Sequence, residues 1–287
     1  MSAGWLRPMT DTNPTILVLG GTGKTARRVV PLLATAGATV RTAARRGADV
    51  RFDWDDVTTF APALDGVTAA YLVAPAERVG YLDEAAGFLD AAEAAGVGHV
   101  TLLSARNVDR LPAEVPIRAV ELEVAGRSRL THSTLRPGWF LQNFTESFFT
   151  PVDGVIVAPA GEGREAFVHV GDIAEVAAAT LLDPATHAGA GYTLTGPEAL
   201  TFAEVAEHLA AATGQPVEHV DADPETWEQG LVEAGLPADY AGLLGGLLAV
   251  LRGSGGAEVT DDVERLTGHA PRGIVDLADE LAVARTR

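Results

Sequence analysis

A glycine-rich turn directly after an apolar segment constrains the fold of this chain more than any other feature. Residues 16–19 are Ile-Leu-Val-Leu, and residues 20–26 are Gly-Gly-Thr-Gly-Lys-Thr-Ala. When a strand leads into a helix through such a turn, one glycine permits the turn and another lets the backbone approach a pyrophosphate. A third small residue keeps the helix close to the strand. Gly20, Gly23 and Ala26 meet these requirements, so the sequence predicts a dinucleotide-binding turn.

The same letters can be read as the end of a nucleoside-triphosphate P-loop, because Gly23-Lys24-Thr25 matches its final G-K-T. That loop also needs a glycine five positions before its last one, and Val18 stands there. This departure argues against a P-loop. A turn that only connects a strand to a helix remains the alternative.

Two arginines end the second predicted strand, residues 39–44. In dinucleotide-binding folds, an acidic residue about 20 positions after the glycines binds the ribose 2′-hydroxyl, whereas an arginine there accepts a 2′-phosphate. Arg45 and Arg46 occupy this place. The pattern favours NADPH over NADH, and the alternative is a solvated strand end without a ligand.

Short apolar runs alternate with helical patterns through the first two thirds of the chain. This alternation predicts an α/β fold with a Rossmann, doubly wound parallel sheet. From Pro197 onward the pattern is mostly helical, which indicates a smaller, mostly helical C-terminal lobe. Capping boxes predict helix starts at Asp172 and Thr201. Further strands are expected at residues 49–52, 69–75, 99–104, 131–135 and 191–195.

We expect three parts along the chain. Residues 1–13 form a loose N-terminal extension without periodicity. Residues 14–196 form the NAD(P)-binding Rossmann core, with a cleft-lining insertion at about 139–168. Residues 197–287 form a C-terminal substrate-binding lobe.

Composition excludes several classes of function. The formal net charge is −18, which argues against nucleic acid and anionic membrane partners, because both recruit Lys and Arg. There is no cysteine, so disulfides, thiolate metal sites and a cysteine nucleophile are excluded, and we expect no metal site. No run of about 20 apolar residues and no signal sequence is present. We expect a cytoplasmic protein with a small-molecule substrate, and a homodimer stays open.

Six motifs resemble those of the NmrA-like family of atypical short-chain dehydrogenases/reductases, in particular members similar to ergot-alkaloid reductases and NAD(P)H:quinone reductases. The resemblance extends from residue 15 to about residue 270. It is specific for the family and less so for any one reaction. The motifs lie at residues 20–25, 52–56 (Phe-Asp-Trp-Asp-Asp), 71–75 (Tyr-Leu-Val-Ala-Pro), 135–144 (Leu-Arg-Pro-Gly-Trp-Phe-Leu-Gln-Asn-Phe), 167–174 and 192–197.

The resemblance implies a role for individual residues. Asp53 would contact the adenine, Ser104 would end the fifth strand beside the nicotinamide, and Pro137 would turn against its ring. The alternatives are that Asp53 caps a helix, that the aromatic candidates belong to the core and that Asn143 satisfies loop backbone. The cofactor-binding set is Gly20, Thr22, Gly23, Lys24, Thr25, Arg45, Arg46, Asp53, Val73, Ala74, Pro75, Ser104 and Pro137; the substrate-binding set is Trp139, Phe140, Asn143 and His169.

One departure from the wider dehydrogenase pattern bears on the chemistry. Ordinary short-chain dehydrogenases place a Tyr about a dozen residues after the strand-end Ser and a Lys about four further on. The Tyr protonates the carbonyl and the Lys lowers its pKa. Here the corresponding region contains Ile117 and Glu121, without a Tyr. The predicted catalytic residues are therefore Ser104 and His132, with His169, Arg106 or a water as other proton sources and Asp172 as a helix cap.

The leading hypothesis is an NADPH-dependent oxidoreductase of secondary metabolism. Without the Tyr and Lys, an activated electrophile such as a quinone, an iminium ion or a conjugated aromatic ketone suits the site best, since hydride addition gives a stabilised anion or, from the iminium ion, a neutral amine. Two alternatives remain. One is a redox-neutral epimerase, dehydratase or coupling catalyst on a polyketide-like substrate, and the other is an NADP(H)-sensing regulator without turnover. The fold alone does not separate them.

Overall fold

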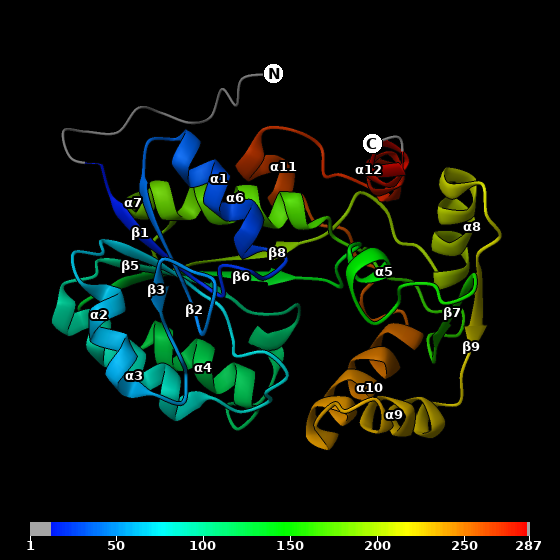
Figure 1. Cartoon of the computed structure of the whole chain (residues 1–287), viewed down its shortest axis with the longest axis horizontal. Coiled ribbons are helices and arrows are strands. Elements are labelled where there is room, and N and C mark those ends of the chain that lie inside the picture. The colour runs from blue at the N-terminus through cyan, green and yellow to red at the C-terminus, as the bar shows by residue number, and fades with distance from the viewer. Residues whose placement is uncertain (1–12, 286–287) are drawn as a thin grey trace. The chain divides into compact units, whose positions relative to one another are not determined.

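The computed structural model describes residues 13–285 of the chain, so the extension predicted at 1–13 lies outside the described residues apart from Asn13 (Figure 1). The chain divides into two compact units. The first contains the described residues up to Pro137, Gly171–Thr193 and Asp262–Gly268. The second contains Gly138–Val170, Leu194–Asp261 and the described residues from His269. The segment expected as an insertion thus groups with the C-terminal part.

A seven-stranded sheet forms the centre of the first unit, in the order β3-β2-β1-β4-β5-β6-β8. The pairs from β3 through β6 are all parallel. This confirms the predicted Rossmann-type sheet, and the order reverses between β1 and β4, where such sheets bind ligands. The strands are β1 (Thr15–Leu19), β2 (Thr39–Ala44), β3 (Val50–Arg51), β4 (Ala69–Leu72), β5 (His99–Leu103), β6 (Thr131–Pro137) and β8 (Ala190–Leu194).

Helices cover both faces of this sheet (Figure 1). On one face lie α1 (Ala26–Thr35) and α6 (Val170–Leu182), and on the other α2 (Phe60–Leu64), α3 (Leu82–Ala95) and α4 (Pro116–Ala125). Central strands buried on both faces need apolar side chains throughout, which is why Ile16 to Leu19 are all buried. The shorter helices of this unit are η1 (Val57–Thr59), η2 (Val108–Arg110), α7 (Pro184–His187) and α11 (Asp262–Thr267).

An aromatic cluster fixes the segment after β3. The Phe52 ring lies 5.0 Å from the Trp54 ring, 5.1 Å from the Phe60 ring and 5.7 Å from the Phe88 ring, between centroids. Phe52 and Trp54 are both buried. Asp53 therefore stands between two anchored aromatic residues, and its backbone has little freedom to move.

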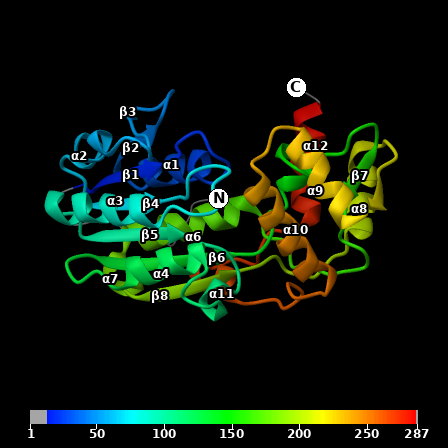
Figure 2. The same ribbon diagram turned by 90° about the horizontal axis from the view of Figure 1, so that it is seen from below.

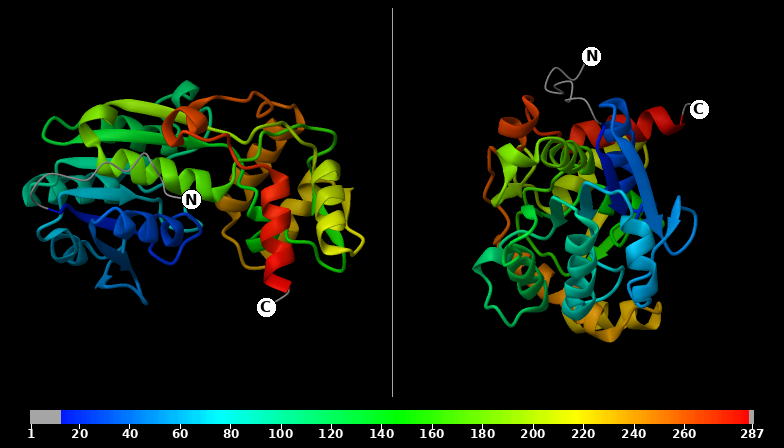
Figure 3. Two further views of the ribbon diagram at one scale, coloured as in Figure 1. Left: turned by 90° about the horizontal axis from the view of Figure 1, so that it is seen from above. Right: turned by 90° about the vertical axis from the view of Figure 1, so that its left-hand side faces the viewer.

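The second unit is mostly helical, as predicted, around a small parallel pair of β7 (Val155–Ala158) and β9 (Glu218–Asp221). Helices α9 and α10 pack together (Figure 2), as do α8 and α12 (Figure 3). Its core contains the buried rings of Phe144, Phe149, Phe167 and Phe202. The helices are α5 (Asn143–Glu146), α8 (Phe202–Thr213), α9 (Pro224–Glu233), α10 (Ala238–Arg252) and α12 (Ile274–Arg285).

Of the two predicted capping boxes, one is confirmed and one is wrong. Thr201 caps α8 together with Glu204, as expected. Helix α6 instead begins at Val170, so Asp172 is buried in its first turn and is not the cap. The backbone N–H of Val170 donates to Oε1 of Gln142 at 2.9 Å, and this distant acceptor lets the helix start earlier.

No helix in residues 13–285 has the length and apolar character that a membrane crossing requires.

Candidate functional site

The glycine-rich turn lies at the carboxyl end of β1, beside the point where the strand order reverses. Gly20 has φ +63°, in the left-handed region that favours glycine. The N–H of Gly23 donates to the Gly20 carbonyl at 2.7 Å, and a Cβ at Gly23 would stand only 3.1 Å from that oxygen. A side chain at either position would therefore disturb the turn.

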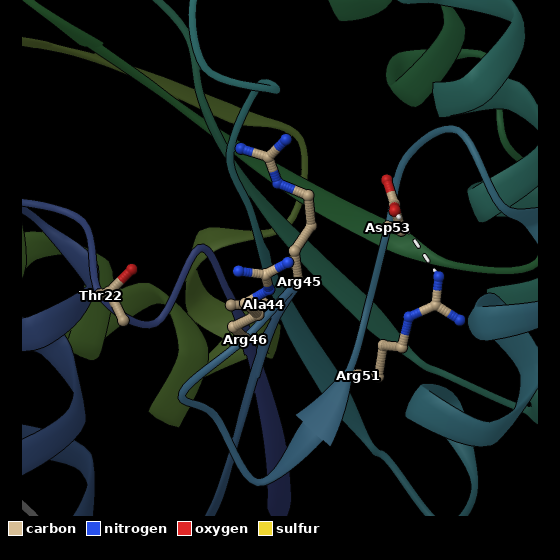
Figure 4. A pocket seen from close by; sticks show the side chains of 6 residues that line it. All are labelled: Thr22, Ala44, Arg45, Arg46, Arg51 and Asp53. Carbon is tan, nitrogen blue, oxygen red and sulfur yellow. Dashed lines mark ion pairs between the residues drawn. The ribbon is translucent and has the colours of Figure 1, made fainter.

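Gly21 brings the turn against β2. A Cβ at Gly21 would lie 2.9 Å from Cβ of Thr42, so the close approach requires glycine. This contact places Thr22 beside the end of β2. A pocket of about 590 Å³ opens there, lined by Thr22, Ala44, Arg45, Arg46, Arg51 and Asp53 (Figure 4).

The loop that carries the two predicted arginines is fastened by Asp49. Oδ2 of Asp49 accepts from the N–H of Thr42 at 2.8 Å and from its hydroxyl at 2.7 Å. These hydrogen bonds lower the pKa of Asp49 below its ordinary value, so the carboxylate stays charged at neutral pH. Arg45 and Arg46 are exposed on this loop, and neither forms an ion pair with any residue from 13 to 285.

The charges of this pocket fit one end of a phosphorylated dinucleotide. Three guanidinium groups and one carboxylate face it, in a chain whose formal net charge is −18. Arginine forms strong, bidentate hydrogen bonds with phosphate. Arg45 and Arg46 could hold the 2′-phosphate of NADP(H), and the turn at residues 20–25 could hold the pyrophosphate.

Several predicted residues meet at the carboxyl edge of the sheet. The N–H of Ser104 donates to the Leu135 carbonyl at 2.8 Å, and the N–H of Arg106 donates to the Pro137 carbonyl at 2.9 Å. Ser104 and Pro137 therefore lie on adjacent chain segments. Val73, Ala74 and Pro75 follow β4, which neighbours β5, and reach the same edge.

Glu121, at the place of the missing Lys, is the acceptor of a buried ion pair. Its carboxylate is 2% exposed and accepts from Nε and Nη2 of Arg136, both at 2.9 Å, and from Nη1 of Arg118 at 2.8 Å. Burial disfavours the charged form, but these hydrogen bonds outweigh burial and lower the pKa of Glu121. Glu121 is therefore ionised at neutral pH and has no proton to give.

The Ser104 hydroxyl lies beside this carboxylate. It lies close enough to help lower the pKa of Glu121, but its buried Oγ forms no hydrogen bond of regular geometry within residues 13–285. The hydroxyl is thus held at the edge of the sheet with free hydrogen-bonding capacity.

The strand register does not bring His132 to Ser104, which argues against a shared catalytic site. His132 is the second residue of β6 and pairs with Val100, whereas Ser104 bonds to Leu135. His132 and Leu135 are three residues apart along β6, which corresponds to roughly 10 Å along the strand. His132 lies toward the amino-terminal end of the parallel strands, away from the edge at which Ser104 lies.

The four predicted substrate-binding residues all belong to the second unit. The Trp139 ring lies 5.3 Å from the Phe149 ring and packs against the aromatic core. Phe140 is half-buried and Asn143 is buried. His169 is buried, with Nε2 3.3 Å from Oε1 of Glu280.

Two charged features of the site were missed from the sequence. Arg51 lines the pocket beside Asp53, and Arg136 binds Glu121. Arg51 ends a strand at the same edge as Arg45, and this shared position is a signal that the sequence contains. Nothing in the sequence pairs Arg136 with Glu121 before the fold is known. Within the described chain, no group of three or more His, Asp or Glu side chains is arranged to hold a metal ion.

Comparisons with known proteins identify the family and the fold of this chain. The model of the NmrA-like family matches residues 12–265. An uncharacterised oxidoreductase of Bacillus subtilis, YesF, is 37% identical over 94% of this chain and 96% of its own length. Agroclavine dehydrogenase of Claviceps fusiformis is 32% identical over 93% and 96%. The crystal structure of an NADPH-dependent quinone oxidoreductase from Escherichia coli in complex with NADPH has a TM-score of 0.74 at 23% identity, covering 93% of this chain and 99% of that one.

Proposed function

Since the chain belongs to the NmrA-like family, we propose that it is an NADPH-dependent oxidoreductase that reduces an activated small-molecule electrophile. The observation that carries this proposal is the arginine-lined pocket next to the glycine-rich turn. The related oxidoreductase and dehydrogenase sequences support the redox assignment. NADPH, when bound, supplies the hydride.

The residues of the chain bind the cofactor and orient the substrate. Gly20 and Gly23 let the turn bring the amino-terminal end of α1 toward a pyrophosphate, where helix N–H groups bind anions. Arg45 and Arg46 bind the 2′-phosphate. Ser104 offers a hydroxyl at the carboxyl edge of the sheet, where it can donate to or accept from a substrate oxygen or nitrogen.

The lack of the Tyr and Lys pair, with an ionised Glu121 at the place of the Lys, favours one substrate class. A positioned general acid contributes about 10²–10⁴-fold to rate, and Glu121 cannot serve as one because two guanidinium groups keep it ionised. Quinones, iminium ions and conjugated aromatic ketones need little acid assistance. The quinone oxidoreductase structure is named for one such acceptor, and the similarity to agroclavine dehydrogenase supports a substrate of secondary metabolism. Trp139, Phe140, Asn143 and His169 are our candidates for substrate contacts.

The test follows NADPH absorbance and product mass while purified protein is mixed with a panel of quinones, imines and aromatic ketones, and with an aliphatic ketone as control acceptor. We expect turnover with the activated acceptors and little with the aliphatic ketone. Ser104→Ala should lower kcat by about tenfold, the cost of one good hydrogen bond, with unchanged NADPH affinity. The exposed Ser128→Ala is the matched control.

Three outcomes would contradict the proposal. NADPH binding without turnover of any acceptor would indicate a regulator. Conversion of a substrate without loss of NADPH would indicate a redox-neutral enzyme. Efficient reduction of the aliphatic ketone would show that an acid lies elsewhere in the site.

A further inference from the structure

We propose that Arg51 determines the preference for a 2′-phosphate by neutralising Asp53 in the same pocket; this inference rests on the proposed function. Figure 4 shows the carboxylate of Asp53 at the pocket that also contains Arg45, Arg46 and Arg51. Asp53 lines the pocket together with Arg45 and Arg46, the two residues assigned to the phosphate. A phosphate monoester carries a charge of roughly −1.5 to −2, so an uncompensated carboxylate there would repel it.

Asp53 cannot easily turn its backbone away from the pocket. Its neighbours Phe52 and Trp54 are buried in the aromatic cluster. Its N–H donates to the Thr59 hydroxyl at 3.1 Å, and its Oδ1 accepts from the N–H of Asp55 at 3.3 Å. The carboxylate therefore stays at the pocket, and its charge must be balanced by a neighbouring group.

Arg51 is placed to balance that charge. Its Nη2 lies 3.7 Å from Oδ2 of Asp53, and its Nη1 lies 3.1 Å from Oδ2 of Asp56. Asp56 in turn accepts from the N–H and the hydroxyl of Thr58, which hold it at the start of η1. Asp56 thus keeps the Arg51 guanidinium beside Asp53.

The Arg51–Asp53 pair is exposed enough that its main effect falls on the charge of the pocket and not on the folding stability. The Arg51 side chain is 61% exposed and that of Asp53 is 24% exposed, and ion pairs of this kind add little to folding stability. Loss of Arg51 should therefore leave the fold intact. It should instead leave the Asp53 charge facing any anion that enters the pocket.

The experiment compares two ligands that differ only in the 2′-phosphate, adenosine 2′,5′-bisphosphate and 5′-AMP. Their Kd values are measured by titration calorimetry on the full chain and on three variants, Arg51→Gln, Asp53→Asn and the double variant. Arg129→Gln is the matched control, because Arg129 is an exposed arginine that precedes β6, away from the carboxyl ends of the strands. Circular dichroism checks that each variant is folded.

For Arg51→Gln we expect the affinity for the bisphosphate to fall on the order of tenfold, with less than about a twofold change for 5′-AMP. In the double variant the bisphosphate should regain most of its affinity, because the repelling charge is gone. Arg129→Gln should match the unmodified protein.

Two results would overturn the inference. An unchanged ratio of the two affinities in Arg51→Gln would show that Arg51 does not act on the pocket. If the double variant binds the bisphosphate as weakly as Arg51→Gln does, Arg51 is a direct phosphate ligand and not a residue that neutralises Asp53. Failure of the cofactor assignment is distinguishable, because the unmodified protein would then bind both ligands equally.

Discussion

Replacing Glu121 with Gln is expected to lower the free energy of unfolding by about 3 kcal/mol. Removing one partner of a buried ion pair costs about 3–5 kcal/mol, because the other charge is left uncompensated. Glu121 is 2% exposed and accepts three hydrogen bonds, from Arg136 and Arg118. The arginine side chains are 16% and 22% exposed, so water can reach them after the substitution, and the lower end of that range applies.

Urea denaturation followed by circular dichroism measures this loss, and hydrogen exchange of residues 116–137 assigns it to α4 and β6. The control is Glu123→Gln on the same helix, which weakens a partly exposed pair with Arg127 and should cost less than about 1 kcal/mol. Equal effects of the two substitutions would refute the assignment of Glu121 as the anchor of a buried pair. Glu121→Lys should be worse than Glu121→Gln, because an ammonium would face two guanidinium groups.

Three other predictions concern stability and cofactor binding. Burial lowers the pKa of His99 to about 4, so between pH 6.5 and 4 the unfolded chain binds a proton at this residue that the folded chain does not bind. The free energy of unfolding should therefore fall as the pH drops through this range, by up to roughly 3 kcal/mol. His99→Gln should weaken this pH dependence, measured by urea titrations at several pH values. Gly23→Val should abolish NADPH binding while circular dichroism stays unchanged, because its side chain would crowd the Gly20 carbonyl; retained binding would make the turn purely structural. Arg45→Ala should weaken NADPH binding by about tenfold and leave NADH binding unchanged in calorimetric titrations, and equal losses for both cofactors would remove Arg45 from the 2′-phosphate site.

Most of the first unit could be predicted from the sequence because its strands are short apolar runs between turn signals. The run at residues 16–19 occupies a strand buried on both faces, where apolar side chains are required, whereas the strand at 99–103 also buries His99 and Thr101. The pair of β7 and β9 could not be found this way. The β9 segment, Glu218–Asp221, contains only one apolar residue, Val220, and its strand conformation comes from pairing with β7.

The cofactor end of the site was easier to predict than the chemical end. Glycines in a turn and arginines at a strand end have local physical causes, and the structure places Thr22 of that turn and both arginines around one pocket. The Glu121–Arg136 pair joins a helix to a strand, so it exists only once both have packed. His132 was predicted to be catalytic although it stands early in a strand, and the register pairs it with Val100, three residues before the Leu135 level at which Ser104 bonds.

We propose that this chain transfers a hydride from NADPH to a small molecule. The most direct test is a single turnover with NADPH deuterated at C4 of the nicotinamide and an imine or aromatic ketone from the panel, whose reduced carbon keeps the deuterium, followed by mass spectrometry of the product. We expect a product that carries one deuterium, with an equal amount of NADP⁺ formed. A product without deuterium, or a substrate changed while the label stays in NADPH, would contradict it.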